Sequence, residues 1–305
     1  MPRAPCRIVI ALLLLLSWPN TATHAETALM MPLAHRSLLL DIAAVGPRLV
    51  AVGDRGHVLV SDDAEAGWQQ ARVPTRQMLT AVHFSTEKLG WAVGHDGLVL
   101  VTNNGGMDWS RQYDGLALQA GYTRTRLQSL TDRQTALEQS LAEAGDAAVR
   151  ARLLATLEEL SLDIEDAEYA LEAPLQTPPL LDVWFRDALH GFAVGAFGTL
   201  LLTDDGGANW RHADEALENP QQLHLNGVVG DEQGSVWIAA ESGLLFRSRD
   251  AGASWTTLAS PYPGTFFGIS RAPDSGRLLA FGLRGHAFYS DDAVSYTHLR
   301  AHETS

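Results

Sequence analysis

The sequence predicts an all-β protein, a β-propeller of four-stranded antiparallel blades that is interrupted by one antiparallel helical hairpin. Three observations predict this fold. A short motif recurs five times, at intervals of 41, 101, 45 and 42 residues; glycines precede each copy; and the one long interval holds a proline-free segment with helical leucine spacing. A repeat of about 40 to 50 residues with four short strands is typical of a propeller blade. Five blades begin in the chain, and we expect six to seven in the intact protein.

The composition agrees with a folded chain. Of the 305 residues, 46% are hydrophobic, which is enough for a buried core. The formal charge of −14, from 22 basic and 36 acidic residues, argues against nucleic-acid binding, because the phosphate backbone requires a basic face. The single cysteine, Cys6, excludes a disulfide framework and a zinc site built from cysteines.

The recurring motif reads S/T-x-D-x-G-x-x-W and is an Asp-box. Its Ser or Thr and its Asp can bond nearby backbone N–H groups and hold a turn, while its Trp can bury a large surface between strands. We interpret it as a structural turn; a binding site is the alternative. The fifth copy begins with Ser290 and Asp292 and then departs from the motif. The other copies are Ser61, Asp63 and Trp68; Thr102, Asn104, Gly106 and Trp109; Thr203, Asp205, Gly207 and Trp210; and Ser248, Asp250, Gly252 and Trp255.

Glycines and β-prone runs place the strands of each unit. A glycine stands five residues before each Ser or Thr, and in four copies a second glycine stands three residues earlier, as in Gly53 and Gly56. The fourth copy has Ala240 at the earlier position. Each unit is predicted to contain four strands. A glycine-containing hairpin joins the second strand to the third, and an Asp-box turn joins the third to the fourth. We expect the glycines to provide positive φ angles at the hairpin tips.

The long interval contains an insertion, which we predict as an antiparallel helical hairpin over 117–172. Leucines at 127, 130, 137 and 141 form one stripe, and a second stripe from Val149 to Leu171 has spacings of 4, 4, 3, 4, 3 and 4. Gly145 and Asp146 separate the two halves. From Glu158 to Glu172 there are seven acids and no base, which predicts either a solvated face or a face that docks a partner.

Both ends fall outside the predicted propeller, which we place at 26–293 and expect to be truncated at its C-terminus. Residues 1–25 are typical of a secretory signal peptide, because their apolar run is too short to span a bilayer; an uncleaved anchor is the alternative. The signal predicts export to the periplasm of a Gram-negative bacterium, with no transmembrane segment after cleavage. Residues 294–305 break the repeat, and we predict that they are a non-native tail; a divergent natural tail is the alternative.

Blade topology predicts a binding face. In a propeller, the hairpins between second and third strands lie on the same face as the blade-to-blade connections, and the Asp-box turns lie on the other. The helical insertion is such a connection, so it should rise from the face of the glycine hairpins. The alternative is that each hairpin tip is merely solvated. We expect this face to bind a partner through Arg55, His95, Phe197, Glu241, Tyr262 and Arg284.

The repeat units and the blade opening L-x-D-V-x-F resemble the photosystem II stability and assembly factor-like family, which is related to bacterial neuraminidase repeat proteins. The units are clearest at Ala92 to Trp109 and at Ala193 to Trp210, and the resemblance covers 30–293. The chain is similar to a non-photosynthetic bacterial branch that carries a helical hairpin and whose genes often lie near exporter genes. The resemblance implies a seven-bladed assembly factor that binds a membrane protein through an arginine-rich face, where Arg55 and Arg284 could belong. The acidic hairpin departs from that pattern.

A sialidase-like glycoside hydrolase is the alternative function, because Asp-boxes occur in sialidases. Such an enzyme needs three arginines for the substrate carboxylate and a Tyr–Glu nucleophile pair. Arg55 and Arg284 could supply two arginines, but Tyr262 has no evident glutamate partner in the sequence. We find neither a helical pair of histidines nor a G-x-S-x-G motif, and we expect no catalytic residues, no metal and no cofactor. The sequence thus predicts a non-enzymatic monomer whose partner is a membrane or cell-envelope protein.

Overall fold

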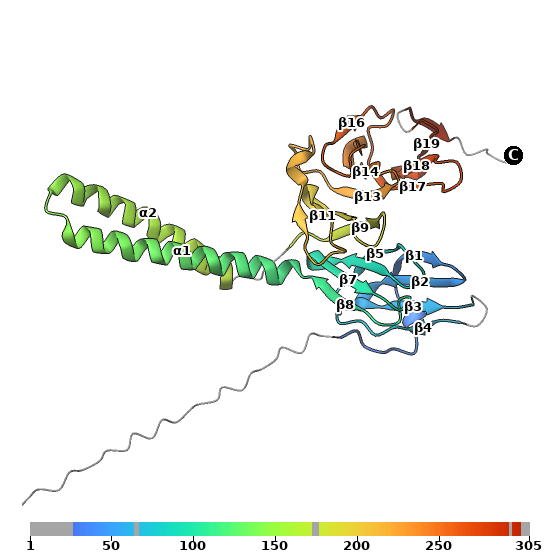
Figure 1. The fold of residues 1–305 in the computed structure, drawn as a ribbon, viewed down its shortest axis with the longest axis horizontal. Coiled ribbons are helices and arrows are strands. Elements are labelled where there is room, and N and C mark those ends of the chain that lie inside the picture. The colour runs from blue at the N-terminus through green and yellow to red at the C-terminus, as the bar shows by residue number, and fades with distance from the viewer. Residues whose placement is uncertain (1–26, 64–66, 173–176, 293–294, 300–305) are drawn as a thin grey trace, which may run out of the picture.

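The computed structural model describes residues 27–63, 67–172, 177–292 and 295–299. The predicted signal peptide therefore lies outside the described residues. Within these ranges, twenty strands form five four-stranded antiparallel sheets, each a meander in sequence order, which confirms the predicted propeller blades. Figure 1 shows the sheets following one another from the first blade (blue) to the fifth (red), with the two helices projecting from them.

The blades have the following bounds. Blade 1 contains β1 (Leu39–Val45), β2 (Arg48–Gly53), β3 (Val58–Ser61) and β4 (Gln69–Gln70); blade 2 contains β5 (Leu79–Phe84), β6 (Gly90–Gly94), β7 (Leu98–Thr102) and β8 (Ser110–Tyr113). Blade 3 contains β9 (Leu180–Phe185), β10 (Gly191–Gly195), β11 (Leu200–Thr203) and β12 (Arg211–His212). Blade 4 contains β13 (Leu225–Gly230), β14 (Val236–Ala240), β15 (Leu245–Ser248) and β16 (Thr256–Leu258); blade 5 contains β17 (Phe266–Arg271), β18 (Leu278–Gly282), β19 (Ala287–Ser290) and β20 (Thr297–Leu299).

The hydrophobic core lies between the blades. Successive side chains of a strand point to opposite faces, so each middle strand serves two interfaces. On β6, Ala92 packs toward blade 1, whereas Trp91 and Val93 pack toward blade 3. The indole of Trp91 stacks on the ring of Phe185 with centroids 3.4 Å apart, and its Nε1 donates to Gln112 Oε1 at 3.0 Å. Among the described residues, blades 2, 3 and 4 thus bury both faces by stacking on two neighbours, whereas blades 1 and 5 each pack against one.

The innermost strands β1, β5, β9, β13 and β17 pack side by side in this order. Each has a β-bulge near its start, where the pairing with the second strand shifts by one residue. Two kinds of hydrogen bond alternate between these strands. Asp41 and Asp182 accept from the backbone N–H of Val82 and Val228 on the next blade, both at 2.8 Å. These bonds join blades 1 and 2 and blades 3 and 4. Between blades 2 and 3, Thr80 Oγ1 donates to Leu180 O at 2.7 Å, and between blades 4 and 5, Asn226 Nδ2 donates to Phe266 O at 2.7 Å.

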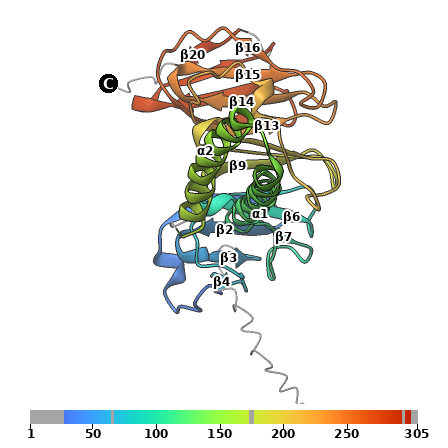
Figure 2. The same ribbon diagram turned by 90° about the vertical axis from the view of Figure 1, so that its left-hand side faces the viewer.

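The insertion forms two antiparallel helices, α1 (Gly115–Glu143) and α2 (Ala147–Glu172), which confirms the predicted hairpin. Asp114 caps α1 by accepting from Ala117 N, and Asp146 accepts from Val149 N at the start of α2. Figure 2 shows the two helices side by side, projecting from the blades. Among the described residues, no helix combines the length and apolar character needed to cross a membrane.

The expected role of the paired glycines was only half right. In the tip of blade 1, Gly56 has the positive φ that was predicted, +70°, but Gly53 is extended, with φ 178°. Gly53 is instead required by close packing, because a Cβ there would lie 2.1 Å from the carbonyl oxygen of Leu38. Gly53 therefore lets the end of β2 lie close to the backbone of Leu38, just before β1.

The Asp-boxes form the turns that were predicted from their side chains. Thr203 Oγ1 donates to Asp205 Oδ1 at 2.9 Å and accepts from Gly207 N at 2.8 Å, and Asp205 Oδ1 accepts from Asn209 N at 2.9 Å. The same bonds recur in blades 2 and 4. In blade 5, Ser290 Oγ donates to Asp292 Oδ1 at 3.0 Å although the motif then breaks off.

The structure continues blade 5 into the segment predicted to be a non-native tail. Thr297–Leu299 pair with β19 as its outer strand β20. The origin of this tail remains a prediction, because a short strand can form at an open sheet edge whatever its source.

Candidate functional site

The face that carries the helical hairpin is built around five tight turns, one in each blade. The turns are the 3-10 segments Asp54–Gly56, His95–Gly97, Ala196–Gly198, Glu241–Gly243 and Leu283–Gly285, each between the second and third strands. The pairing of Leu39 with Gly53 places the first turn at the start of β1, where the chain enters the blade. Blade entry and turn therefore share one face, which we call the turn face.

The middle residue of every turn has a left-handed backbone. The φ angles are 56° at Arg55, 60° at Asp96, 55° at Phe197, 56° at Ser242 and 62° at Arg284. A residue with a Cβ pays about 1 kcal/mol or more for this conformation, and a bulky side chain is unusual there. The sequence pattern did not reveal this, because it assigned the positive φ to the glycines alone.

Four of the six predicted binding residues are exposed at these turns. Phe197 is 61% exposed, and its ring lies T-shaped against the His224 ring, at a centroid distance of 5.1 Å. The side chain of Arg55 is 66% exposed, with Nε 3.4 Å from Asp54 Oδ2. His95 and Arg284 are also exposed. An aromatic and two guanidinium groups in fixed turns suit the recognition of a protein segment.

The other two predicted residues are occupied within the fold. Glu241 Oε2 accepts from His224 N at 2.9 Å, which secures the entry to β13. Tyr262 donates its hydroxyl to Leu283 O at 2.7 Å and packs its ring near His286, Phe266 and Phe288. Both side chains thus position the turn face; a direct contact with a partner remains a prediction.

A pocket lies at the base of the helical hairpin, between blades 2 and 3. We call it the root pocket; its volume is about 260 Å³, and Tyr113, Leu118, Pro178, Leu180 and Leu201 supply most of its apolar wall. Leu118, from the first turn of α1, is 43% exposed. The pocket is large enough for one apolar side chain of a partner. Sequence reasoning missed it because its wall comes from the hairpin and two blades at once.

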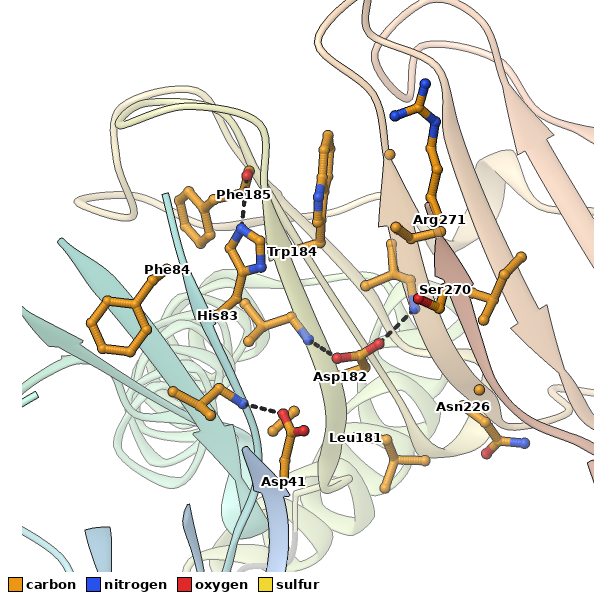
Figure 3. A pocket seen from close by; sticks show the side chains of 18 of the residues that line it. Asp41, His83, Phe84, Leu181, Asp182, Trp184, Phe185, Asn226, Ser270 and Arg271 are labelled. Carbon is orange, nitrogen blue, oxygen red and sulfur yellow. Dashed lines mark hydrogen bonds between the residues drawn. The ribbon is translucent and has the colours of Figure 1, made fainter. Parts of the chain in front are cut away.

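A larger cavity of about 930 Å³ runs along the inner strands and is drawn in Figure 3. His83 on β5 hydrogen-bonds through Nε2 to Phe185 O at 2.9 Å, and burial lowers the pKa of this imidazole to about 4. Burial raises the pKa of Asp182 to about 7, against the opposing effect of backbone N–H donors from Val228 and Val183.

The titratable groups of this cavity serve the packing of the blades. Both carboxylate oxygens of Asp182 accept backbone hydrogen bonds, and His83 bridges blades 2 and 3. Arg271 and Trp184 lie toward one end of the cavity in Figure 3. Within the part of the chain that the structure describes, no group of three or more His, Cys, Asp or Glu side chains could hold a metal ion.

Comparison with known proteins identifies related chains. Residues 60–133 and 166–289 match the family model described as photosynthesis system II assembly factor YCF48. The unmatched stretch between these ranges, 134–165, lies within the helical hairpin. The family match therefore covers blades 2 to 4 and most of blade 5, together with the two ends of the hairpin nearest the blades.

Two curated relatives carry related names. The photosystem II assembly lipoprotein Ycf48 of Synechococcus sp. (strain CC9902) is 39% identical over 111 residues, 34% of this chain and 32% of the relative. The chloroplastic photosystem II stability/assembly factor HCF136 of Cyanidioschyzon merolae (strain NIES-3377 / 10D) is 36% identical over 95 residues, 29% of this chain and 22% of the relative. The chain thus matches about a third or less of the length of these two relatives.

Solved structures agree on the fold. One titled "YCF48 bound to D1 peptide" aligns with a TM-score of 0.51 at 14% identity and covers 90% of this chain and 71% of that chain. The computationally designed protein Ika8 aligns with a TM-score of 0.51 at 12% identity, covering 87% of this chain and 62% of that chain. At such low identity these similarities establish the fold alone.

Proposed function

Because the chain belongs to the photosynthesis system II assembly factor YCF48 family, we propose that it is an assembly-accessory propeller that binds a segment of a membrane or cell-envelope protein through its turn face. The relatives are named for photosystem II assembly, and one solved YCF48 carries a D1 peptide. For this chain the partner class is inferred from those names and from the chemistry of the face.

One observation carries the proposal: Arg55, Phe197 and Arg284 are exposed in left-handed turns. Exposed residues in a costly backbone conformation cluster at ligand-binding sites, because binding rather than packing retains them. The turns fix the backbone at these positions, so a partner segment would bind with little loss of backbone entropy there. The root pocket on the same face offers a place for an apolar anchor of that segment.

The proposal includes export and the absence of catalysis. We infer that residues 1–25 direct the chain to the periplasm of a Gram-negative bacterium, and one relative is named a lipoprotein. We infer further that the chain works as a monomer without a cofactor, and that an exporter is one candidate for the membrane partner. In the glycoside hydrolase alternative Tyr262 would be the nucleophile, but its hydroxyl is engaged by Leu283 O. No observation favours that activity.

The experiment is co-purification of membrane and envelope proteins with the tagged chain from its native host. Arg55→Glu with Arg284→Glu, and separately Phe197→Ala, should abolish recovery of the partner, since they reverse the charge or remove the aromatic contact of the turn face. Arg249→Glu and Leu189→Ala are matched controls, because both residues are exposed in turns on the face of the blades opposite the turn face. Equal recovery with all variants, each still folded by circular dichroism, would refute the turn face as the binding site.

A further inference from the structure

The side of α2 that faces away from α1 carries two large apolar side chains among its acids. Leu160 and Ala167 pack inward and are buried, whereas Leu162 is 59% exposed and Tyr169 is 74% exposed. We call this the outer α2 face; its members are Ala155, Glu158, Leu162, Glu165, Tyr169 and Glu172. Large exposed apolar side chains in a row on one helix indicate a surface for another protein.

The spacing of this face has the form of a helix-packing surface. Ala155, Leu162 and Tyr169 are seven residues apart, and Glu158, Glu165 and Glu172 form a second row with the same period. A seven-residue repeat keeps side chains along one gently supercoiled seam, where a second helix can follow them. An irregular or extended partner segment would not use this period over three turns or more.

The charge of α2 selects the kind of partner. Its last half contains seven acids and no base, and none of these carboxylates forms an ion pair with another described residue. The acids are Glu158, Glu159, Asp163, Glu165, Asp166, Glu168 and Glu172. A second copy of this face would bring like charges together, and an anionic lipid surface would be repelled. Only a basic partner gains from this arrangement.

We propose that the outer α2 face binds a basic amphipathic α-helix of a partner protein, which packs along α2 as a third helix. Apolar side chains of that helix lie against Leu162 and Tyr169, and its Lys or Arg side chains lie against Glu158, Glu165 and Glu172. The proposal deepens the proposed function and rests on it only for the premise that the chain has a protein partner. It needs none of the residues of the turn face.

The test uses the full chain and two synthetic helical peptides of 21 residues with the same leucine heptads. One peptide carries arginines beside the leucines and the other carries glutamates at the same places. Fluorescence anisotropy should detect binding of the arginine peptide only, and the binding should weaken as salt is raised, because exposed ion pairs are screened. Equal affinity for the two peptides would overturn the proposal.

Variants locate the binding on α2. Changing Glu158, Glu165 and Glu172 together to Gln should weaken binding of the arginine peptide about tenfold, the sum of three exposed ion pairs. Changing Leu162 and Tyr169 to Ala should weaken binding of the arginine peptide more than the three Gln substitutions do. A matched control changes Asp132 to Asn and Glu138 and Glu143 to Gln, acids exposed on α1, and should change affinity less than about twofold.

Two outcomes separate this proposal from the proposed function. The Arg55→Glu and Arg284→Glu variant should keep full affinity for the arginine peptide even where it loses the membrane-protein partner. If the Gln variant of the outer α2 face binds the arginine peptide as tightly as the parent while its helical circular dichroism is unchanged, the proposal is wrong, whatever happens at the turn face.

Discussion

Phe197 illustrates how single residues of the turn face are placed against their local preference. Its φ of 55° is disfavoured for any residue with a Cβ, and the ring gains little burial in return. The same backbone conformation occurs at Arg55 and Arg284. Local stability therefore does not explain these residues, which is why we assign them to partner binding.

The first prediction compares two substitutions at Phe197. Phe197→Gly should be more stable than Phe197→Ala by about 1 kcal/mol, because only glycine adopts the left-handed conformation without a steric penalty. Urea unfolding monitored by tryptophan fluorescence measures the difference. In strand or helix interiors, alanine is instead more stabilising than glycine. An Ala variant as stable as the Gly variant would therefore show that the turn is not held in the left-handed conformation.

A second prediction concerns Asp182. Its pKa of about 7 in the folded protein lies above the ordinary value of 3.8. Between about pH 4 and 7 the folded protein therefore keeps a proton that the unfolded chain has released. The contribution of Asp182 to the free energy of unfolding should fall as pH rises through this window, by up to about 1.4 kcal/mol per pH unit. Asp182→Asn should lack this slope, as measured by urea unfolding at several pH values.

His83 acts in the opposite direction and provides the matched control. Its pKa of about 4 lies below the ordinary 6.5, so the folded protein binds fewer protons than the unfolded chain between these values. This contribution makes stability rise with pH from about 4 to 6.5. His83→Gln should therefore steepen the fall caused by Asp182. Parallel pH curves for the parent and both variants would contradict the assigned protonation states.

At the scale of elements, the two glycines of each turn have different physical roles. Gly56 provides a positive φ, while Gly53 allows the backbone of Leu38 to lie against β2. Ala240 shows that the earlier position can accept a Cβ when the strand is slightly rotated, since its φ is −137° rather than near 180°. The close approach recurs in the other four blades, where a Cβ on Gly53, Gly94, Gly195 or Gly282 would lie 2.1 to 2.4 Å from a carbonyl oxygen.

The third prediction follows from this difference. Gly53→Ala should destabilise the protein by about 1–3 kcal/mol, because the new Cβ meets backbone atoms that cannot move without disturbing the entry to β1. Ala240→Gly is the control and should cost about 1 kcal/mol or less, through backbone entropy alone. Thermal unfolding followed by circular dichroism compares the two. Equal losses would refute the packing explanation for Gly53.

At the scale of the whole molecule, the helical hairpin and the propeller form separate packing units joined at one point. Blades 2 and 3 pack directly through Trp91, Val93 and Phe185, without help from the helices. The chain enters and leaves the insertion at neighbouring points, since a Cβ on Gly115 would lie 3.1 Å from Thr177 Oγ1. The insertion can therefore be long without separating the blades that it connects.

The fourth prediction tests this independence. Replacing residues 117–172 with a short Gly-Ser linker should remove the helical circular dichroism and leave a folded propeller whose Tm changes by no more than about 4 °C. The excised chain should also lose its affinity for the basic helical peptide. Loss of the β-sheet spectrum on excision would show that the hairpin supports the blades and would contradict the separation described above.

Much of the fold could be predicted from the sequence, because the relevant signals are local. The β-prone runs, the Asp-box side chains and the leucine spacing between Val149 and Leu171 all report on neighbours within about seven residues. The repeat then converts local strands into blades, and the order of the connections places the hairpin on the turn face. Arg55, His95, Phe197 and Arg284 could be identified in the same way, as tips of hairpins.

Tertiary structure decided what each of these residues is free to do. Glu241 and Tyr262 occupy the predicted positions, yet backbone partners at His224 and Leu283 engage them, and those partners lie in other segments of the chain. The root pocket and the raised pKa of Asp182 also arise only where separate blades meet. The sequence alone determined which elements form and in what order, because hydrophobic period and turn chemistry act over short range. Exposure, pocket shape and protonation depend on contacts between distant segments, and only the packed blades establish them.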